Sequence, residues 1–193
     1  ITATLGCSGG PSRVEPPYID PDSAAAEAIE LYDQNGDAQL DLDELAQCPG
    51  ILSSLGAYDA DGSETVSQQE IANRLATRGA KRIGLLSMQA QVRFNGKPLP
   101  GADVTFLPEP YLGEEIKTAY GKTTSGGSAF MAIPDEELPE SQRGLNAIHV
   151  GTYKVLVSHP EVELPPQYSS ATETPLGFET ESGQSIVRFD LKK

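Results

Sequence analysis

The sequence predicts an α+β protein with two domains, a small helical module followed by an antiparallel β-sandwich. Two acidic stretches in the first part of the chain repeat each other: "YDQNGDAQLDLDEL" at 32–45 and "YDADGSETVSQQEI" at 58–71. From about Leu86 the apolar residues alternate with polar ones, and Gly and Pro turn signals become frequent. A chain of 193 residues can bury two small cores. We therefore expect an extended arm at 1–22, a helical module at 23–83 and the sandwich at 84–193.

Charge is distributed unevenly along the chain. The chain has 14 basic and 28 acidic residues, so nucleic acid is an improbable partner. Residues 14–73 contain fourteen acids and no Lys or Arg, whereas fourteen acids face thirteen bases from Arg74 onward. Nearly all of the net charge of −14 thus lies in residues 14–73, the first part of the chain. Divalent cations would relieve part of the repulsion there.

Four helices are predicted around the acidic repeats. Asp22 or Ser23 offers an N-cap for a first helix of good helix formers that ends near Tyr32. "LDELAQC" predicts a second helix stopped by Pro49 and Gly50, "ILSSLGAY" a third, and "QQEIANRLATRGAKR" a longer fourth.

About seven antiparallel strands, with no helix between them, are predicted after Leu86. Asn95-Gly96 after "MQAQVRF" is a strong hairpin signal, and "ADVTFL" follows it. Two further turns are expected to make hairpins, one at 125–127 between "IKTAYGKTT" and "SAFMAI", the other at 182–183 between "GFETE" and "SIVRFDL". "GTYKVLVS" is the most regular strand, and seven such strands favour a β-sandwich.

The repeated stretches place oxygen-bearing residues at the spacing of a twelve-residue calcium loop. Calcium takes six to eight oxygen ligands, which such a loop supplies from positions one, three, five, seven (a carbonyl), nine and twelve. The sequence thus predicts two Ca²⁺ sites, the first made by Asp33, Asn35, Asp37, Gln39, Asp41 and Glu44, and the second by Asp59, Asp61, Ser63, Thr65, Ser67 and Glu70. Leu40 and Val66 are expected to bridge the paired loops. The alternative is a solvated acidic surface.

Position six of each loop, where a positive φ is wanted, lacks glycine. It holds Ala38 and Glu64, whereas Gly36 and Gly62 lie two places earlier. A non-glycine residue there costs roughly 1–2 kcal/mol. We therefore expect weak sites, with dissociation constants of about 0.1–1 mM as in extracellular modules, and the second site weaker than the first.

The two cysteines leave three alternatives open. Cys7 and Cys48 could form a disulfide, Cys7 could be lipidated after Leu5-Gly6, or both could be free thiols. Either of the first two alternatives places the protein outside the cytosol. No apolar stretch is long enough to span a bilayer.

Residues 23–80 resemble a pair of EF-hands. Residues 84–193 resemble the carboxypeptidase-regulatory-like, transthyretin/Ig-like β-sandwich, on "VRFNGKPLPGADVTFLPEP", "GTYKVLVS" and "LPPQYSSATETPLGFETESGQSIVRFDL". With "GCSGG" and "ELAQCPG", the combination is similar to secreted or surface lipoproteins of planctomycete-type bacteria. Sandwiches of this family are generally non-catalytic, so the resemblance implies no catalytic residues.

No other motif indicates an enzyme. "GKT" at 121–123 lacks the glycine that a phosphate loop needs where Ile116 stands. His149 and His159 are expected at the surface ends of one strand, and "PDEELPE" at 134–140 as a solvated loop.

These observations favour an extracellular calcium-binding structural protein at a bacterial cell surface. We expect it to associate with itself, for instance as a filament subunit, by adding the alternating arm "ITATL" to a neighbour's sheet edge. The alternatives are a monomeric, lipid-tethered module that binds a peptide or glycan, and an accessory module of a secreted hydrolase.

Overall fold

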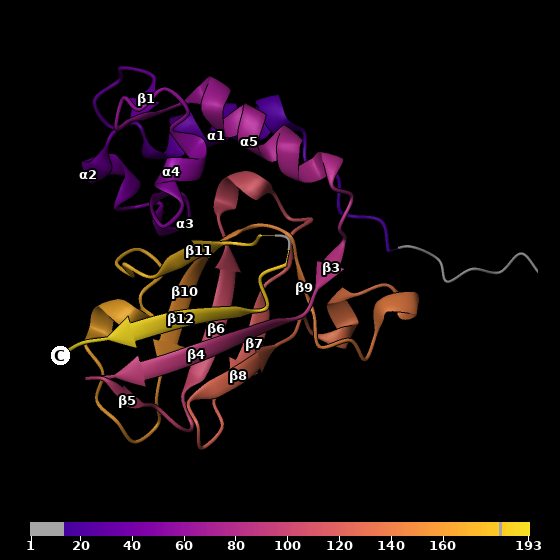
Figure 1. Cartoon of the computed structure of the whole chain (residues 1–193), viewed down its shortest axis with the longest axis vertical. Helices are drawn as coiled ribbons and strands as arrows, with labels where there is room; N and C mark the ends of the chain where they lie inside the picture. The colour runs from indigo at the N-terminus through magenta and orange to yellow at the C-terminus, as the bar shows by residue number, and fades with distance from the viewer. Residues whose placement is uncertain (1–13, 182) are drawn as a thin grey trace, which may run out of the picture.

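The computed structural model describes residues 14–181 and 183–193, which form a mixed α+β fold (Figure 1). The helices precede the sheets in the chain and lie over one end of them in space. The helical elements and their two short strands are α1 (Pro21–Tyr32), β1 (Gln39–Leu40), α2 (Leu42–Leu45), α3 (Pro49–Leu52), α4 (Leu55–Tyr58), β2 (Val66–Ser67) and α5 (Gln68–Ala80).

Local signals explain where these helices begin. Helix α1 begins at Pro21, slightly before the expected cap, because Asp20 accepts the backbone N–H of Ser23 and Pro fits the first helical position. Pro49 likewise fits the first position of α3, although no side chain caps that helix, and it does not merely end the helix before it. The single helix expected over 51–58 is instead two short helices, α3 and α4, separated at Ser53 and Ser54.

The seven predicted strands are present, some of them shorter than expected. They are β4 (Met88–Phe94), β6 (Asp103–Pro108), β7 (Ala119–Lys122), β8 (Ser128–Met131), β10 (Thr152–Ser158), β11 (Gly177–Glu179) and β12 (Ile186–Leu191). Three further strands of two residues each were not expected: β3 (Leu85–Leu86), β5 (Lys97–Pro98) and β9 (Ile148–His149). Short 3-10 helices that were not expected lie between them, at η1 (Pro110–Leu112), η2 (Asp135–Glu137), η3 (Glu140–Gln142) and η4 (Pro166–Ser169).

The strands form two principal sheets. One has the order β11-β10-β6-β7, and the other has β4 at its centre with β12 on one side and β5 and β8 on the other. The sheets share one core, in which the ring of Phe189 lies 6.1 Å from that of Phe106 and 6.2 Å from that of Phe178. Alternation along β12 explains this packing, because Val187, Phe189 and Leu191 point inward.

Two predicted hairpins are wrong in their pairing. β7 pairs with β6, whereas β8 pairs with β4, and the one backbone bridge described between β7 and the end of β8 joins Tyr120 to Ala132. Likewise β11 pairs with β10, while β12 crosses to the other sheet and runs parallel to β4, so the expectation of a wholly antiparallel fold is wrong at this strand. At 125–127 a tight turn is present, in which the Gly127 N–H donates to Thr124 O at 2.9 Å. In both cases the strands diverge into different sheets and cover the two sides of one core.

The helical part docks directly on the sheets through α3. A Cβ atom built on Gly177 of β11 would lie 2.3 Å from the carbonyl carbon of Pro49 and 2.4 Å from the backbone nitrogen of Gly50. Only a glycine in β11 permits this approach. No helix in the described ranges is long and apolar enough to cross a membrane.

Candidate metal loops and the interface beneath them

The two repeated stretches fold as a pair of helix–loop–helix units. The first loop connects α1 to α2 and the second connects α4 to α5. Strands β1 and β2 join the loops side by side, with Leu40 opposite Val66 and both side chains fully buried. This confirms that these two residues bridge the loops. A second link is made by the residues at position seven, because the Thr65 hydroxyl donates to Oε1 of Gln39 at 2.6 Å.

The first carboxylate of each loop organises the turn that follows it. Asp33 accepts the backbone N–H of Gly36 at 2.7 Å and of Ala38 at 2.9 Å. Asp59 accepts the equivalent N–H groups of Gly62 at 2.8 Å and of Glu64 at 3.0 Å. The two loops therefore fold in the same way, although their sequences differ at most other positions.

Both loops contain two left-handed residues, not one. Position six is left-handed as expected, with φ 65° at Ala38 and 63° at Glu64. Position four is left-handed as well, with φ 79° at Gly36 and 76° at Gly62. The glycines are thus not displaced from position six, since they serve a separate left-handed position of their own.

The last carboxylate of each loop reaches back across it. Glu44 accepts the N–H groups of Gln34 and Asn35 on Oε1 and that of Asp41 on Oε2, at 2.8, 3.1 and 2.9 Å. Glu70 accepts those of Ala60 and Ser67 in the same manner, at 2.9 and 2.8 Å.

Asp41 and Ser67, at position nine, have a second role. Each is the N-cap of the outgoing helix and forms a reciprocal capping box with the glutamate three residues later. These four residues would therefore be useful to the fold without any ion, which is why hydrogen bonds alone do not identify a metal site.

The second loop gathers its carboxylates most closely. Asp59, Asp61 and Glu70 each have an oxygen within 4.8 Å of the other two, and no other group of three acidic, Cys or His residues in the described ranges does so. The side chain of Ser63 lowers the pKa of Asp61 by hydrogen bonding. Burial raises the pKa of Glu70, but hydrogen bonds from Ser67 and Ala60 outweigh it, and the net shift is downward. Both groups are therefore ionised at neutral pH.

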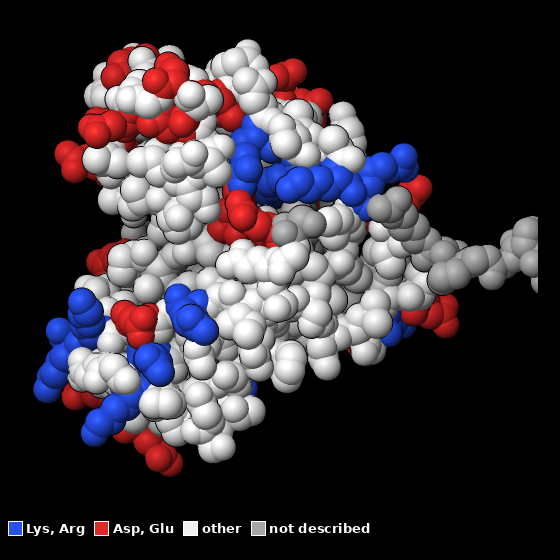
Figure 2. Space-filling view, in the orientation of Figure 1, with Lys and Arg blue, Asp and Glu red and all other residues white. Residues whose placement is uncertain are grey.

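The donors of both loops suit a hard cation, since the twelve predicted residues provide only oxygen: carboxylates, amides, hydroxyls and backbone carbonyls. In the first loop, the carboxylates of Asp33, Asp37 and Glu44 lie less close together than those of the second loop. Its third position holds the amide Asn35. Acidic side chains gather over the loop end of the helical part, whereas basic side chains follow α5 beneath it (Figure 2).

Beneath the loops lies a buried polar interface that the sequence analysis missed. Tyr32 and Tyr58, the residues just before the two loops, each donate a hydroxyl hydrogen to a buried glutamate of the sheet region. The partners are Glu109 at 2.7 Å and Glu179 at 2.8 Å. A cation also lies over each tyrosine ring. Lys154 Nζ is 5.5 Å from the centroid of the Tyr32 ring, and the guanidinium carbon of Arg74 is 5.9 Å from that of Tyr58. The repeat thus extends from the loops into the interface.

The two glutamates differ in charge environment. Glu179 is fully buried, but Arg78 at 2.6 Å, Arg74 and Tyr58 offset the desolvation and lower its pKa. Burial raises the pKa of Glu109. Lys154, whose Nζ lies 3.9 Å from Oε2, offsets only part of this effect. Burial also raises the pKa values of Tyr32 and Tyr58, so both hydroxyls stay protonated and donate. A tyrosine at the same place in both repeats was the available signal, because a buried hydroxyl needs a partner.

The remaining predicted residues are placed as follows. Cys48 is fully buried beside α3, and Cys7 lies outside the described residues, so their pairing stays a prediction. His159 is only partly exposed, and its Nδ1 accepts the backbone N–H groups of Glu161 at 3.0 Å and Val162 at 2.8 Å. His149 is not at the surface: it is buried, and its Nδ1 accepts the backbone N–H of Lys117 at 3.1 Å. Asp135, Glu136 and Glu137 are exposed, as predicted for that loop.

Comparison with known proteins identifies no relative: no protein-family model, curated protein or solved structure matches this chain.

Proposed function

We propose that the chain is a non-enzymatic, calcium-binding structural protein in which paired EF-hand loops hold two Ca²⁺ ions above a transthyretin-like β-sandwich. One observation carries the proposal: two loops of the same ligand pattern share the same backbone conformation, with left-handed residues at positions four and six in both. A merely acidic surface would not need that conformation twice. The β1–β2 pair joins the two loops to each other, and the buried tyrosines just before the loops attach them to the sheet region.

The ions would act as counterions in a rigid joint. Without them, the carboxylates of Asp59, Asp61 and Glu70 repel each other at close range. The loops are modest in ligand charge, and their left-handed Ala38 and Glu64 add strain. This combination suits sites that are filled at the millimolar calcium of an extracellular setting and suits a cytosolic sensor poorly. We therefore propose an extracellular or cell-surface location, and self-association as the use of the rigid joint.

Calorimetric titration of the full chain with CaCl₂ tests the calcium proposal. Glu44→Gln and Glu70→Gln each remove one bidentate carboxylate but keep a residue that can form the capping box. We expect two ions per chain in the parent, one in each single variant and none in the double variant. Asp43→Asn, which changes an exposed acid in the first loop region that is not among the predicted ligands, is the matched control and should still bind two. Equal calcium binding by the parent and the double variant would refute the assignment.

A further inference from the structure

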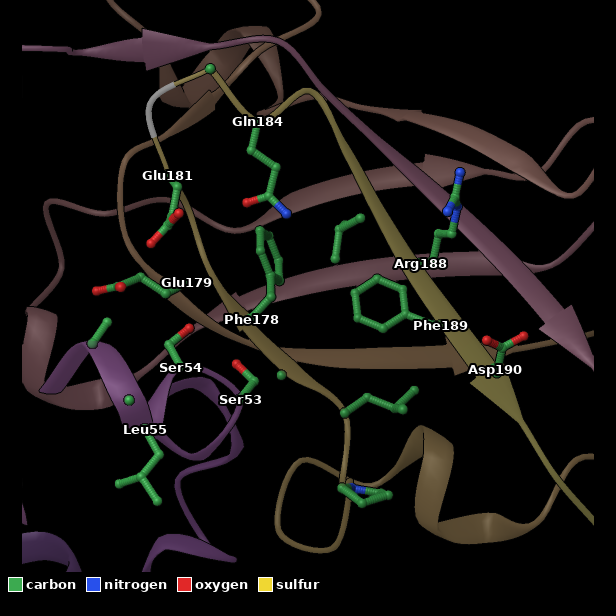
Figure 3. A pocket seen from close by; sticks show the side chains of 17 residues that line it. Ser53, Ser54, Leu55, Phe178, Glu179, Glu181, Gln184, Arg188, Phe189 and Asp190 are labelled. Carbon is green, nitrogen blue, oxygen red and sulfur yellow. The ribbon is translucent and has the colours of Figure 1, made fainter. Parts of the chain in front are cut away.

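The two principal sheets are joined along one side and open along the other. On the joined side, Tyr120 and Ala132 exchange backbone hydrogen bonds of 2.8 and 2.9 Å between β7 and β8. On the open side, β12 and β11 are the end strands of their sheets. A groove of about 860 Å³ runs between them and is bordered on its other wall by the α3–α4 connection (Figure 3).

The free edge of β12 has unused backbone hydrogen-bonding groups. In the parallel ladder, Ser185 O accepts from Gln89 N at 2.8 Å and Leu191 O accepts from Asn95 N at 2.9 Å. Because alternate residues of a strand turn their N–H and C=O to opposite sides, the groups of Ile186, Arg188 and Asp190 point away from β4. The one contact described for them is a long one, from the side-chain amide of Gln184 to Ile186 O at 3.5 Å. An open edge of this length is a template for another strand.

The groove suits an extended occupant with one apolar face, because apolar side chains line it together with the charged Glu181, Arg188 and Asp190. The rings of Phe178 and Phe189 form part of its floor, and Ser53 and Ser54 stand on the opposite wall (Figure 3). A strand lying on β12 would turn alternate side chains toward those rings and the others toward solvent.

Residues 1–5 of the chain have the required pattern. Ile1, Ala3 and Leu5 alternate with Thr2 and Thr4, and residues 1–12 contain no charged side chain in a protein of net charge −14. Such a segment approaches another copy without the repulsion that the acidic loops would cause. The described chain begins at Val14, which lies against Gly84 beside β3, at the opposite end of the molecule from the C-terminus of β12 (Figure 1).

We propose that the gap between β12 and β11 is the acceptor for residues 1–5 of a second copy, which add to β12 as a new strand. The inference rests on the proposed self-association and names its acceptor surface. Because donor and acceptor are different surfaces, the contact is heterologous and builds chains of molecules rather than a closed twofold dimer.

Two substitutions at one edge position test the acceptor. Arg188→Pro removes the N–H that points away from β4, so it blocks strand addition while sparing the ladder to β4. Arg188→Ala keeps that N–H and is the control. In sedimentation velocity runs with calcium, we expect association by the parent and by Arg188→Ala, and its loss in Arg188→Pro and in the chain lacking residues 1–6. Unchanged calcium binding by Arg188→Pro verifies that it is folded.

A second measurement separates the acceptor from the proposed self-association. The synthetic peptide ITATLG is added to the chain lacking residues 1–6, and exchange of the Ile186, Arg188 and Asp190 amides is followed; we expect their protection. Association that persists in Arg188→Pro overturns the assignment of β12 as the acceptor but leaves the proposed self-association intact.

A parent chain that stays monomeric contradicts self-association. If its β12 amides are then protected, and deletion of residues 1–6 removes that protection, the segment fills its own groove and the second-copy inference is overturned. Absence of protection by the peptide overturns the acceptor as well.

Discussion

Tyr58, the residue immediately before the second loop, donates its hydroxyl hydrogen to the fully buried carboxylate of Glu179, 2.8 Å away and 121 residues later in the chain. The bond connects the proposed metal loop directly to β11. Its counterpart between Tyr32 and Glu109 connects the first loop to the segment after β6. Two equivalent tyrosines therefore hold the helical part on the sheets at two points.

Replacing Tyr58 with Phe tests the strength of this connection. The substitution leaves the ring packed but removes a hydrogen bond to an ionised acceptor, which contributes about 1.5–3 kcal/mol. We expect the free energy of unfolding, measured by urea denaturation, to fall by about 2 kcal/mol. Tyr120→Phe, at a half-exposed ring, should change it by less than about 0.5 kcal/mol. Equal stability of the two variants would show that the Tyr58 hydroxyl contributes nothing to docking.

Gly177→Ala tests the close approach of α3 to β11. The added Cβ would lie 2.3 Å from the carbonyl carbon of Pro49 and 2.4 Å from the backbone nitrogen of Gly50. Because both are backbone atoms, neither can rotate away. The helix must shift, at a cost of about 1–3 kcal/mol or more. Gly126→Ala is the control, since the nearest atom to its Cβ would be Oγ1 of Thr124 at 4.0 Å. A melting temperature for Gly177→Ala equal to that of the control would contradict the described packing.

Glycine at position six tests the strain in the loops. Ala38→Gly and Glu64→Gly place the residue that tolerates positive φ where φ is 65° and 63°. Relief of about 1 kcal/mol should tighten calcium binding by roughly fivefold at the altered loop. Gly36→Ala and Gly62→Ala should do the opposite, although a Cβ there would meet no atom within 4 Å. Tighter binding after the alanine substitutions would contradict the left-handed conformation at position four.

Much of the arrangement follows from local sequence signals. Alternation predicted β4 residue for residue, and the spacing of the repeats predicted the pairing of Leu40 with Val66. These features depend on residues close together in the chain, for which periodicity and turn residues are strong guides.

Features that depend on distant partners were not predictable in the same way. β12 runs parallel to β4 because it covers the opposite side of the shared core from β11, and the residues of β12 alone do not reveal this. Glu109 and Glu179 look like surface acids in sequence, yet their burial is compensated by side chains from α1, α4 and α5. A charged residue is interpreted as buried only when its partner is known.

The buried position of His149 predicts a specific acid sensitivity. Burial, together with the charge of Lys117, lowers the pKa of His149 to about 4, compared with about 6.5 for the unfolded chain. The unfolded state therefore binds the proton more readily between those values, and this contribution to stability is complete above pH 6.5 and is lost as the pH falls toward 4. The loss amounts to about 3 kcal/mol at most, at 1.36 kcal/mol per pKa unit. In His149→Gln, the free energy of unfolding should depend less steeply on pH over this range than it does in the parent. Proton NMR titration of the parent measures the same quantity directly, and a His149 pKa near 6.5 would contradict the buried, neutral imidazole that accepts the N–H of Lys117.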